Sequence, residues 1–290
     1  MHFPKYWARG EWHGTRSSGE SWRQLAWAGS DESQADAQTQ ADTKARRVGE
    51  RAVRSESAQR DFYPYSDRQV REPVLRTLDQ TADECAAVVT RTAYGSEVLN
   101  TARMMFVDID LPPAKPGAGL VAAITRLFRG GSAPPAPSPT DARLASLRQW
   151  QSSNPSWAFR VYRTHSGFRY LVTSDWHDPL AGSTHTVLNS LGCDARYQKL
   201  CQIQKSFRAR LTPKPWRCGC DHPPVRFPYE DTRQQALMQQ WLAGYEQSSQ
   251  GYATCQFLAA VGSTSTASGM ASLIAEHDTR TKATSGLPLA

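Results

Sequence analysis

The stretch Met104–Pro112, MMFVDIDLP, joins a run of apolar residues to two aspartates that are one residue apart, Asp108 and Asp110. Apolar runs of this length are typical of buried strands. Side chains at positions i and i+2 of a strand project from the same face, so the two carboxylates are expected to lie together. Like charges at this spacing raise each other's pKa unless a cation lies between them. The stretch therefore predicts a strand that ends in a site for a divalent, oxygen-liganded metal, Mg²⁺ or Mn²⁺.

The residues before this stretch predict an α+β protein with a largely antiparallel central sheet flanked by helices. We expect a short helix near Val70–Leu78, followed by strands at Cys85–Thr90, Glu97–Asn100 and Ala102–Leu111. Three strands so close together leave no room for the crossover helices that a parallel sheet requires. The sequence therefore predicts an antiparallel meander whose last strand carries the aspartates.

The residues after the acid pair predict a β-hairpin at Trp157–Thr173 (WAFRVYRTHSGFRYLVT) that turns at Ser166-Gly167. A two-residue turn there would place Arg163 opposite Tyr170 and Thr164 opposite Arg169, with His165 near the tip. The remaining elements are predicted as strands at Ser206–Leu211 and Tyr252–Val261 and as helices at Asp141–Gln151, Pro179–Leu191, Asp194–Gln204, Thr232–Tyr245 and Ala267–Glu276. The last dozen residues have the composition of a frayed end.

Shifts in composition divide the chain into three parts. Residues 1–80 predict an N-terminal strand–helix addition, with a strand at Ser21–Ala28 and a helix that begins near Ser33 and continues towards Arg54. Residues 81–262 would form the core, interrupted by a flexible Pro-rich insert at 112–141, and residues 263–290 a C-terminal helix and tail. The insert is either a linker or carries a basic, amphipathic helix at Leu120–Arg129 that binds a protein partner.

Charge and hydropathy limit the partners of the protein. The 290 residues carry a formal net charge of +7, which favours nucleic acid or another polyanion, and 39% of them are hydrophobic, enough for a sizeable core. No apolar run approaches the roughly 20 residues that span a bilayer, and the first residues do not have the pattern of a signal peptide. We therefore expect a cytoplasmic protein with no membrane partner; its oligomeric state stays open.

A basic stretch gives the strongest signal for a polyanion. Between Arg196 and Arg217 there are seven basic residues and no acidic residue: Arg196, Lys199, Lys205, Arg208, Arg210, Lys214 and Arg217. Aromatic residues are interleaved with them, and aromatic faces are suited to stacking on bases. On the predicted strand, Arg208 and Arg210 share a face opposite Phe207. We therefore expect one cationic face, which would hold phosphates through arginine forks.

Six cysteines in a chain of this length, without regular spacing, indicate free thiols or metal ligands rather than a disulfide framework. Cys218, Cys220 and His222 lie close enough in sequence to be ligands of a zinc ion, although their spacing departs from the usual paired knuckles. Cys201, Cys85 and Cys255 lie in predicted helices or strands and are expected to be buried thiols.

The order of FVDID (Phe106–Asp110), a hairpin with SGFR (Ser166–Arg169) and a basic strand resembles the catalytic core of the archaeo-eukaryotic primase superfamily. That resemblance implies a palm-like sheet on which Asp108 and Asp110 hold metal ions. Arg169 stands where the nucleotide-binding histidine of the second motif is expected, His165 precedes the turn instead, and no third acid is clearly assigned, Asp175 arriving too early. The chain also resembles bacterial proteins that open with MHFPKYWA and carry RLTPKPWRCG, a resemblance that implies no activity.

The sequence thus predicts a metal-dependent, primase-like nucleotidyltransferase that acts on nucleic acid and nucleotides. Asp108, Asp110 and His165 would form the catalytic group. The phosphates would be held by Arg163, Arg169, Lys205, Arg208, Arg210, Lys214 and Arg217. Two alternatives stay open: a non-catalytic nucleic-acid-binding module whose aspartates merely end a strand, and a scaffold that recruits partners through Leu120–Arg129. Whether the polymer is DNA or RNA is also left open.

Overall fold

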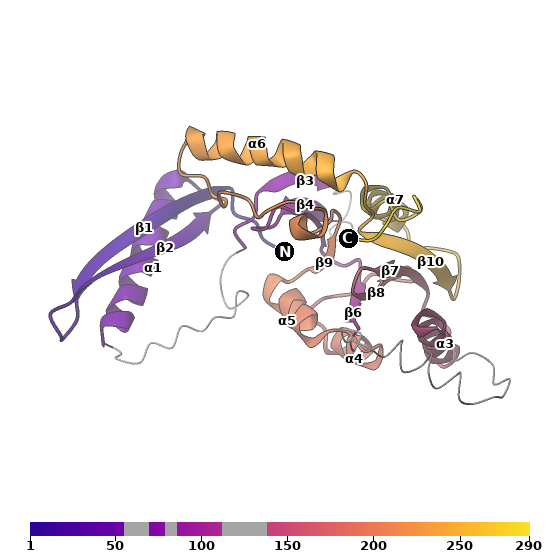
Figure 1. Ribbon diagram of the computed structural model, residues 1–290. Coiled ribbons are helices and arrows are strands. Elements are labelled where there is room, and N and C mark those ends of the chain that lie inside the picture. The colour runs from indigo at the N-terminus through magenta and orange to yellow at the C-terminus, as the bar shows by residue number, and fades with distance from the viewer. Residues whose placement is uncertain (55–69, 79–85, 112–137) are drawn as a thin grey trace, which may run out of the picture.

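The computed structural model describes residues 1–54, 70–78, 86–111 and 138–290. The α+β class is confirmed, and the antiparallel strands form two four-stranded sheets and one separate hairpin. The expected helix at Leu120–Arg129, most of the Pro-rich insert and Cys85 lie outside the described residues. Figure 1 shows the hairpin and its helix on one side, with the two larger sheets beside them.

The N-terminal part is a two-stranded antiparallel hairpin, β1 (Tyr6–Thr15) and β2 (Ser21–Ser30), packed on helix α1 (Gln34–Arg54). The sequence predicted only the second strand and the helix. Small residues spaced four apart, Ala37, Ala41, Ala45 and Gly49, form the buried stripe of α1. This stripe lets the helix approach the hairpin closely, since a Cβ on Gly10 would lie 2.3 Å from the Ala41 backbone.

The first four-stranded sheet has the order β3-β4-β5-β9, with all neighbours antiparallel. Its strands are β3 (Val74–Leu78), β4 (Ala87–Arg91), β5 (Glu97–Thr101) and β9 (Phe207–Arg210). The prediction of a helix near Val70–Leu78 is therefore wrong, because residues 74–78 pair with the edge of β4 that β5 leaves open. Strand β9 lies at the other edge of the sheet.

The second sheet has the order β10-β7-β8-β6. Its strands are β6 (Phe106–Asp110), β7 (Phe159–Thr164), β8 (Gly167–Val172) and β10 (Cys255–Val261). The predicted three-strand meander is thus wrong in one respect, because the acid-bearing strand leaves β5 and pairs with β8 in a different sheet. Strand β6 is an edge strand there, and it contacts β9, the edge strand of the first sheet.

The predicted β7–β8 hairpin exists, but its register differs from the expected one. His165 and Ser166 form the turn, so Arg163 lies opposite Phe168 and Tyr162 lies opposite Arg169. Gly167 is already in strand β8, where its lack of a Cβ permits close pairing: a Cβ there would lie 1.8 Å from the carbonyl oxygen of Ile109. The glycine thus serves the close packing of β6 on β8, and the turn falls one residue earlier than expected.

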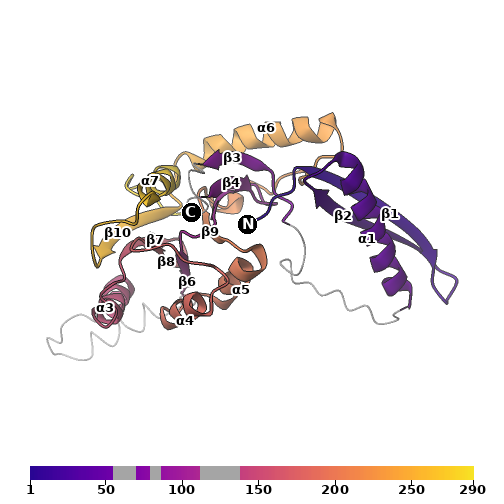
Figure 2. The same cartoon turned by 180° about the vertical axis from the view of Figure 1, so that it is seen from behind.

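Helices cover the two faces of this second sheet (Figures 1 and 2). Helix α7 (Met270–Thr281) lies on one side; α3 (Pro139–Ser152) and α4 (Gly182–Ser190) lie on the other, and α5 (Ala195–Gln204) leads from α4 into β9. Helix α6 (Thr232–Ser249) runs from the side of the N-terminal hairpin towards β10. None of the helices in the described ranges combines the length and the apolar character that a bilayer crossing requires.

The C-terminal residues are not frayed, contrary to expectation. Ala253 forms a parallel bridge with Leu289, and the amide of Ala290 donates to the carbonyl of Ala253. Ala290 is buried, with an exposed fraction of 1%. These backbone bonds fasten the tail to the residues before β10.

We expect Gly167→Ala to lower the free energy of unfolding by about 1–3 kcal/mol, because the new methyl group must displace the backbone of β6. Gly244→Ala in helix α6 is the matched control: a Cβ there meets nothing within 4 Å, and alanine favours a helix interior over glycine. Denaturant unfolding followed by circular dichroism measures both. Equal unfolding midpoints for Gly167→Ala and the unmodified protein would contradict the close β6–β8 approach.

Candidate active site at the junction of two sheets

The acid pair lies on the edge strand β6, as predicted. Asp108 and Asp110 share one face of the sheet. On the adjacent strand β8, Asp108 pairs with Arg169 and Asp110 pairs with Gly167. The Asp108 side chain is partly buried, at 35% exposed, whereas Asp110 is exposed. Because its cross-strand neighbour is a glycine, the Asp110 carboxylate has no directly opposite side chain on β8.

A third carboxylate that the sequence did not single out belongs to this site. Asp194 caps helix α5, where its Oδ1 accepts a hydrogen bond from the amide of Tyr197 (2.9 Å), and its own amide donates to the carbonyl of Asp108 (2.9 Å). Burial, then the charges of Asp108 and Asp194, raise the pKa of the Asp110 carboxyl. The Asp110 carboxylate is thus repelled by two neighbouring carboxylates, and a divalent cation would relieve that repulsion. Asp175, the acid considered from the sequence, instead accepts a bond from the amide of Trp176.

Arg169 is the buried basic partner of the acid pair. Its Nε lies 3.8 Å from Oδ1 of Asp108, and its Nη1 donates to the carbonyl of Arg210 on β9 (3.0 Å). With an exposed fraction of 4%, Arg169 lies beneath the acids and is not open to an incoming phosphate. Its position suits it to orient Asp108 rather than to contact a ligand directly.

A cationic group faces the acids from β9 and the turn that follows. Burial and the neighbouring Arg210 and Arg217 lower the pKa of Lys214, and burial and Arg210 lower the pKa of Arg217. The Asp110 charge opposes both shifts, which places the two groups within electrostatic reach of that carboxylate. Like charges held together in this way favour binding of an anion such as phosphate.

The turn between β7 and β8 adjoins the cationic group. Arg217 donates a hydrogen bond from Nη2 to Oγ of Ser166 (2.8 Å). Burial, followed by the charges of Arg217, Arg210 and Lys214, lowers the pKa of His165. The structure therefore brings together His165, Arg210, Lys214 and Arg217 beside the acid pair.

Three of the predicted phosphate-binding residues lie elsewhere. Arg163 is on the opposite face of the sheet from Asp108, because it neighbours Tyr162, which shares the face of Arg169. Its guanidinium lies 4.8 Å from the centre of the Phe168 ring. Lys205 is an exposed residue at the end of α5. It lies near the amino group of Met1, whose pKa is lowered by burial and then by the Lys205 charge.

Arg208 is buried rather than part of an open cationic face. Its Nη2 donates to both carboxylate oxygens of Glu72, at 2.8 and 2.7 Å. Its exposed fraction is 8%, so the pair holds residues before β3 against β9 inside the fold. The period-two pattern placed Arg208 and Arg210 on one face, but only Arg210 lies at the acids.

The zinc candidates are only partly assembled. Cys218 and Cys220 lie beside each other, and burial, then Cys220, raise the pKa of the Cys218 thiol to about 11. The His222 ring instead stacks on Trp216, with 4.9 Å between ring centres. Within the described ranges, no three His, Cys, Asp or Glu side chains are arranged to hold a metal ion together. Cys201 and Cys255 are buried thiols, as expected.

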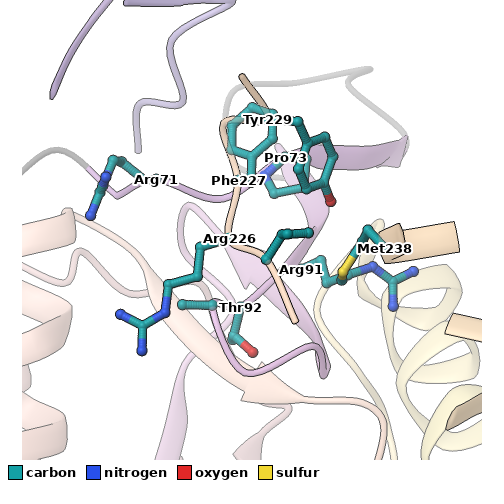
Figure 3. A pocket seen from close by; sticks show the side chains of 10 residues that line it. Arg71, Pro73, Arg91, Thr92, Arg226, Phe227, Tyr229 and Met238 are labelled. Atoms are coloured by element: carbon teal, nitrogen blue, oxygen red, sulfur yellow. The ribbon is translucent and has the colours of Figure 1, made fainter. Parts of the chain in front are cut away.

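A small pocket lies away from the acid pair, between the β4–β5 connection and residues 225–229 (Figure 3). Figure 3 shows Arg91 turned towards Met238, on the opposite side from Arg71 and Arg226. Arg91 is engaged by the carbonyl of Gly95 (3.1 Å) and by Glu97 (3.6 Å). The Arg91 guanidinium is therefore already paired within the protein, so this pocket is a weaker candidate for a functional site than the acid pair.

Comparison of the chain with protein-family models, with curated proteins and with solved structures found no match.

We expect Asp110→Asn to raise the unfolding midpoint at pH 7. The pKa of Asp110 is raised in the folded protein, so the folded chain retains the proton at pH values where the unfolded chain has lost it. The resulting stability is present at low pH and is lost as the pH rises from about 4 through the folded pKa. The gain from Asp110→Asn should thus be smaller at pH 4 than at pH 7.

Thermal unfolding at the two pH values measures this difference, with Glu50→Gln, an exposed acid on helix α1, as the control. A loss of stability at pH 7 in Asp110→Asn alone would show that Asp110 is favourably paired, contrary to this description.

Proposed function

We propose that this protein is a metal-dependent, primase-like nucleotidyltransferase that acts on nucleic acid. The observation that carries the proposal is the juxtaposition of two groups of like charges. On one side, burial and then the charges of Asp108 and Asp194 disfavour the ionised form of Asp110. On the other side, burial and then the charge of Arg210 disfavour the charged forms of Lys214 and Arg217. A divalent cation bound with a nucleotide phosphate would relieve the repulsion in both groups at once.

The acid pair has the chemistry that Mg²⁺ or Mn²⁺ prefers. Mg²⁺ commonly takes one or two protein carboxylates and completes its shell with water and substrate phosphates, so a cage of protein ligands is not required. Asp108 and Asp110 would hold the ion, which supplies neutralisation of charge on the reacting phosphate. Asp194 adds negative charge beside them while capping α5.

The cations would bind the phosphates of the nucleotide. Lys214 and Arg217 are half-buried, and burial followed by the charge of Arg210 disfavours the charged form of both, an effect that a bound phosphate would reverse. Ser166 accepts from Arg217 and so fixes one end of its guanidinium. His165 lies in the same turn, where its lowered pKa favours a neutral ring at physiological pH that is able to accept or donate a hydrogen bond.

An exposed aromatic surface beside the cations suits a nucleic-acid strand. Trp216 is 47% exposed and lies one residue from Arg217. The Lys214 amino group lies 5.5 Å from the centre of its ring, and His222 stacks on it. A flat ring bordered by positive charge is the combination that binds single strands, with bases on the ring and phosphates on the cations.

The alternative is a non-catalytic nucleic-acid-binding module on the same fold. It is favoured by Arg169, which already offsets part of the Asp108 charge from beneath, at 3.8 Å. In that case the cations and Trp216 would bind the strand, and the aspartates would serve only to end β6.

Replacing both aspartates by asparagine, Asp108→Asn with Asp110→Asn, should abolish Mn²⁺-dependent nucleotide incorporation while leaving the fold intact. The loss should exceed about a hundredfold, since the metal would have no ligands of its own. The matched control is Asp175→Asn with Asp178→Asn, which removes the same amount of negative charge. In the described part of the chain, these two carboxylates accept hydrogen bonds from nearby backbone amides, those of Trp176 and Leu180. Extension of a labelled primer on a template measures incorporation; equal extension by both double variants would refute the metal assignment.

Binding of a fluorescent single-stranded oligonucleotide separates the enzyme from the alternative. We expect Lys214→Ala with Arg217→Ala to reduce the dependence of log affinity on log salt by about 0.7 for each phosphate that the protein no longer binds. The control Arg46→Ala with Arg47→Ala removes two exposed charges on α1. Binding that needs Lys214 and Arg217, with no extension by the unmodified protein, would favour the binding module; equal binding by the two variants would contradict both functions.

A further inference from the structure

A buried polar chain runs behind the acid pair, from helix α7 to Arg169. His277 and Asp278 are adjacent residues near the end of α7, and His277 is fully buried. The His277 ring lies against two aromatic rings of the second sheet, Phe106 at 5.5 Å and Tyr162 at 4.8 Å between centres. Nothing in the sequence indicated that His277 lies behind the acid pair, because α7 is far from the other site residues along the chain.

Asp278 fixes one nitrogen of the imidazole. Its carboxylate accepts from the hydroxyl of Tyr162 (2.6 Å) and from Nη2 of Arg160 (2.5 Å), and its Oδ1 lies 3.0 Å from Nδ1 of His277. These bonds and the nearby positive charge lower the pKa of Asp278 despite its burial. Since an ionised carboxylate only accepts hydrogen bonds, Nδ1 of His277 carries a proton.

Arg169 occupies the other nitrogen of the imidazole. Its Nη1 lies 3.4 Å from Nε2 of His277, and a guanidinium only donates hydrogen bonds. Nε2 must therefore be unprotonated to accept from Arg169. Burial above all lowers the pKa of His277 to about 4, and the charge of Arg169 adds to the shift, so the ring is neutral at pH 7.

We propose that His277 is a positioning residue for the acid pair: with Nδ1–H bonded to Asp278, its Nε2 accepts from Arg169 and fixes the direction in which that guanidinium presents Nε to Asp108. Nη1 of Arg169 is then held between His277 and the carbonyl of Arg210. Its Nε is buried without a hydrogen-bond partner among the described residues, and Oδ1 of Asp108 lies 3.8 Å away. The consequence for metal binding rests on the proposed function. The hydrogen bonds that link Asp278, His277 and Arg169 do not depend on it.

The protonation state of His277 in the unmodified protein gives the first test. Nitrogen-15 NMR of the histidine rings at pH 7 should show Nδ1 of His277 protonated and Nε2 unprotonated. A proton on Nε2 would overturn the proposal, because a protonated nitrogen cannot accept from Arg169. This measurement requires no substitution, so it does not depend on whether a variant folds.

The second test compares two substitutions at the same buried position. His277→Phe keeps a planar ring but removes the acceptor, whereas His277→Gln retains an oxygen that accepts from Arg169 and an amide that donates to Asp278. The Arg169 guanidinium, assigned through its contact with the Phe106 ring, should show separate Nη–H signals in the unmodified protein and in His277→Gln. In His277→Phe the guanidinium keeps its bond to the carbonyl of Arg210 but loses the bond to His277, so it should rotate faster and its Nη–H signals should broaden.

Arg160 supplies an internal control, because it bonds Asp278 and not His277. Its signals should persist in both variants. Arg169 signals as sharp in His277→Phe as in the unmodified protein would show that His277 only fills space. Broadening of these signals in His277→Gln, with the Arg160 signals intact, would equally overturn the proposal. Titration of the same samples with Mn²⁺ should show several-fold weaker binding in His277→Phe and recovery in His277→Gln; absence of Mn²⁺ binding in the unmodified protein would instead contradict the proposed function.

Discussion

One buried guanidinium joins the two sheets at the site. Arg169 projects from β8, lies beside the Asp108 carboxylate of β6 and donates to the carbonyl of Arg210 on β9. Both β6 and β9 are edge strands, so each has backbone groups that no further strand satisfies. Arg169 and helix α5 form hydrogen bonds to some of these backbone groups. These bonds bring the acids of one sheet next to the cations of the other.

Helix α5 reinforces the same junction. The amide of Asp194 donates to the carbonyl of Asp108, and the Tyr197 hydroxyl bonds both the amide and the carbonyl of Arg208. The helix start is thereby fixed against both strand edges. Its capping carboxylate consequently lies near Asp110, so the same contact that closes the fold adds a third negative charge to the site.

The sequence allowed the local parts of the site to be predicted, because the strand, its period of two and the basic turn after β9 depend on neighbouring residues. It did not show which basic residues would be used for packing. Arg208 and Arg210 have the same pattern, yet Glu72 neutralises Arg208 in the interior. Arg163 lies on the far face because it is adjacent in β7 to Tyr162, the residue that pairs with Arg169. Asp194 and His277 join the site only through tertiary contacts.

Paramagnetic broadening by Mn²⁺ tests most directly whether the acids and cations of the two sheets share one site. In amide spectra of the full chain, sub-stoichiometric Mn²⁺ should first broaden the signals of Gly167, Asp194 and Lys214, which come from β8, α5 and the turn after β9. The amides of Arg16 and Gly19, in the hairpin connection on the far side of the molecule (Figure 1), should broaden last. Broadening centred on residues 218–222, or spread evenly over the chain, would contradict the account of this junction as a metal and phosphate site.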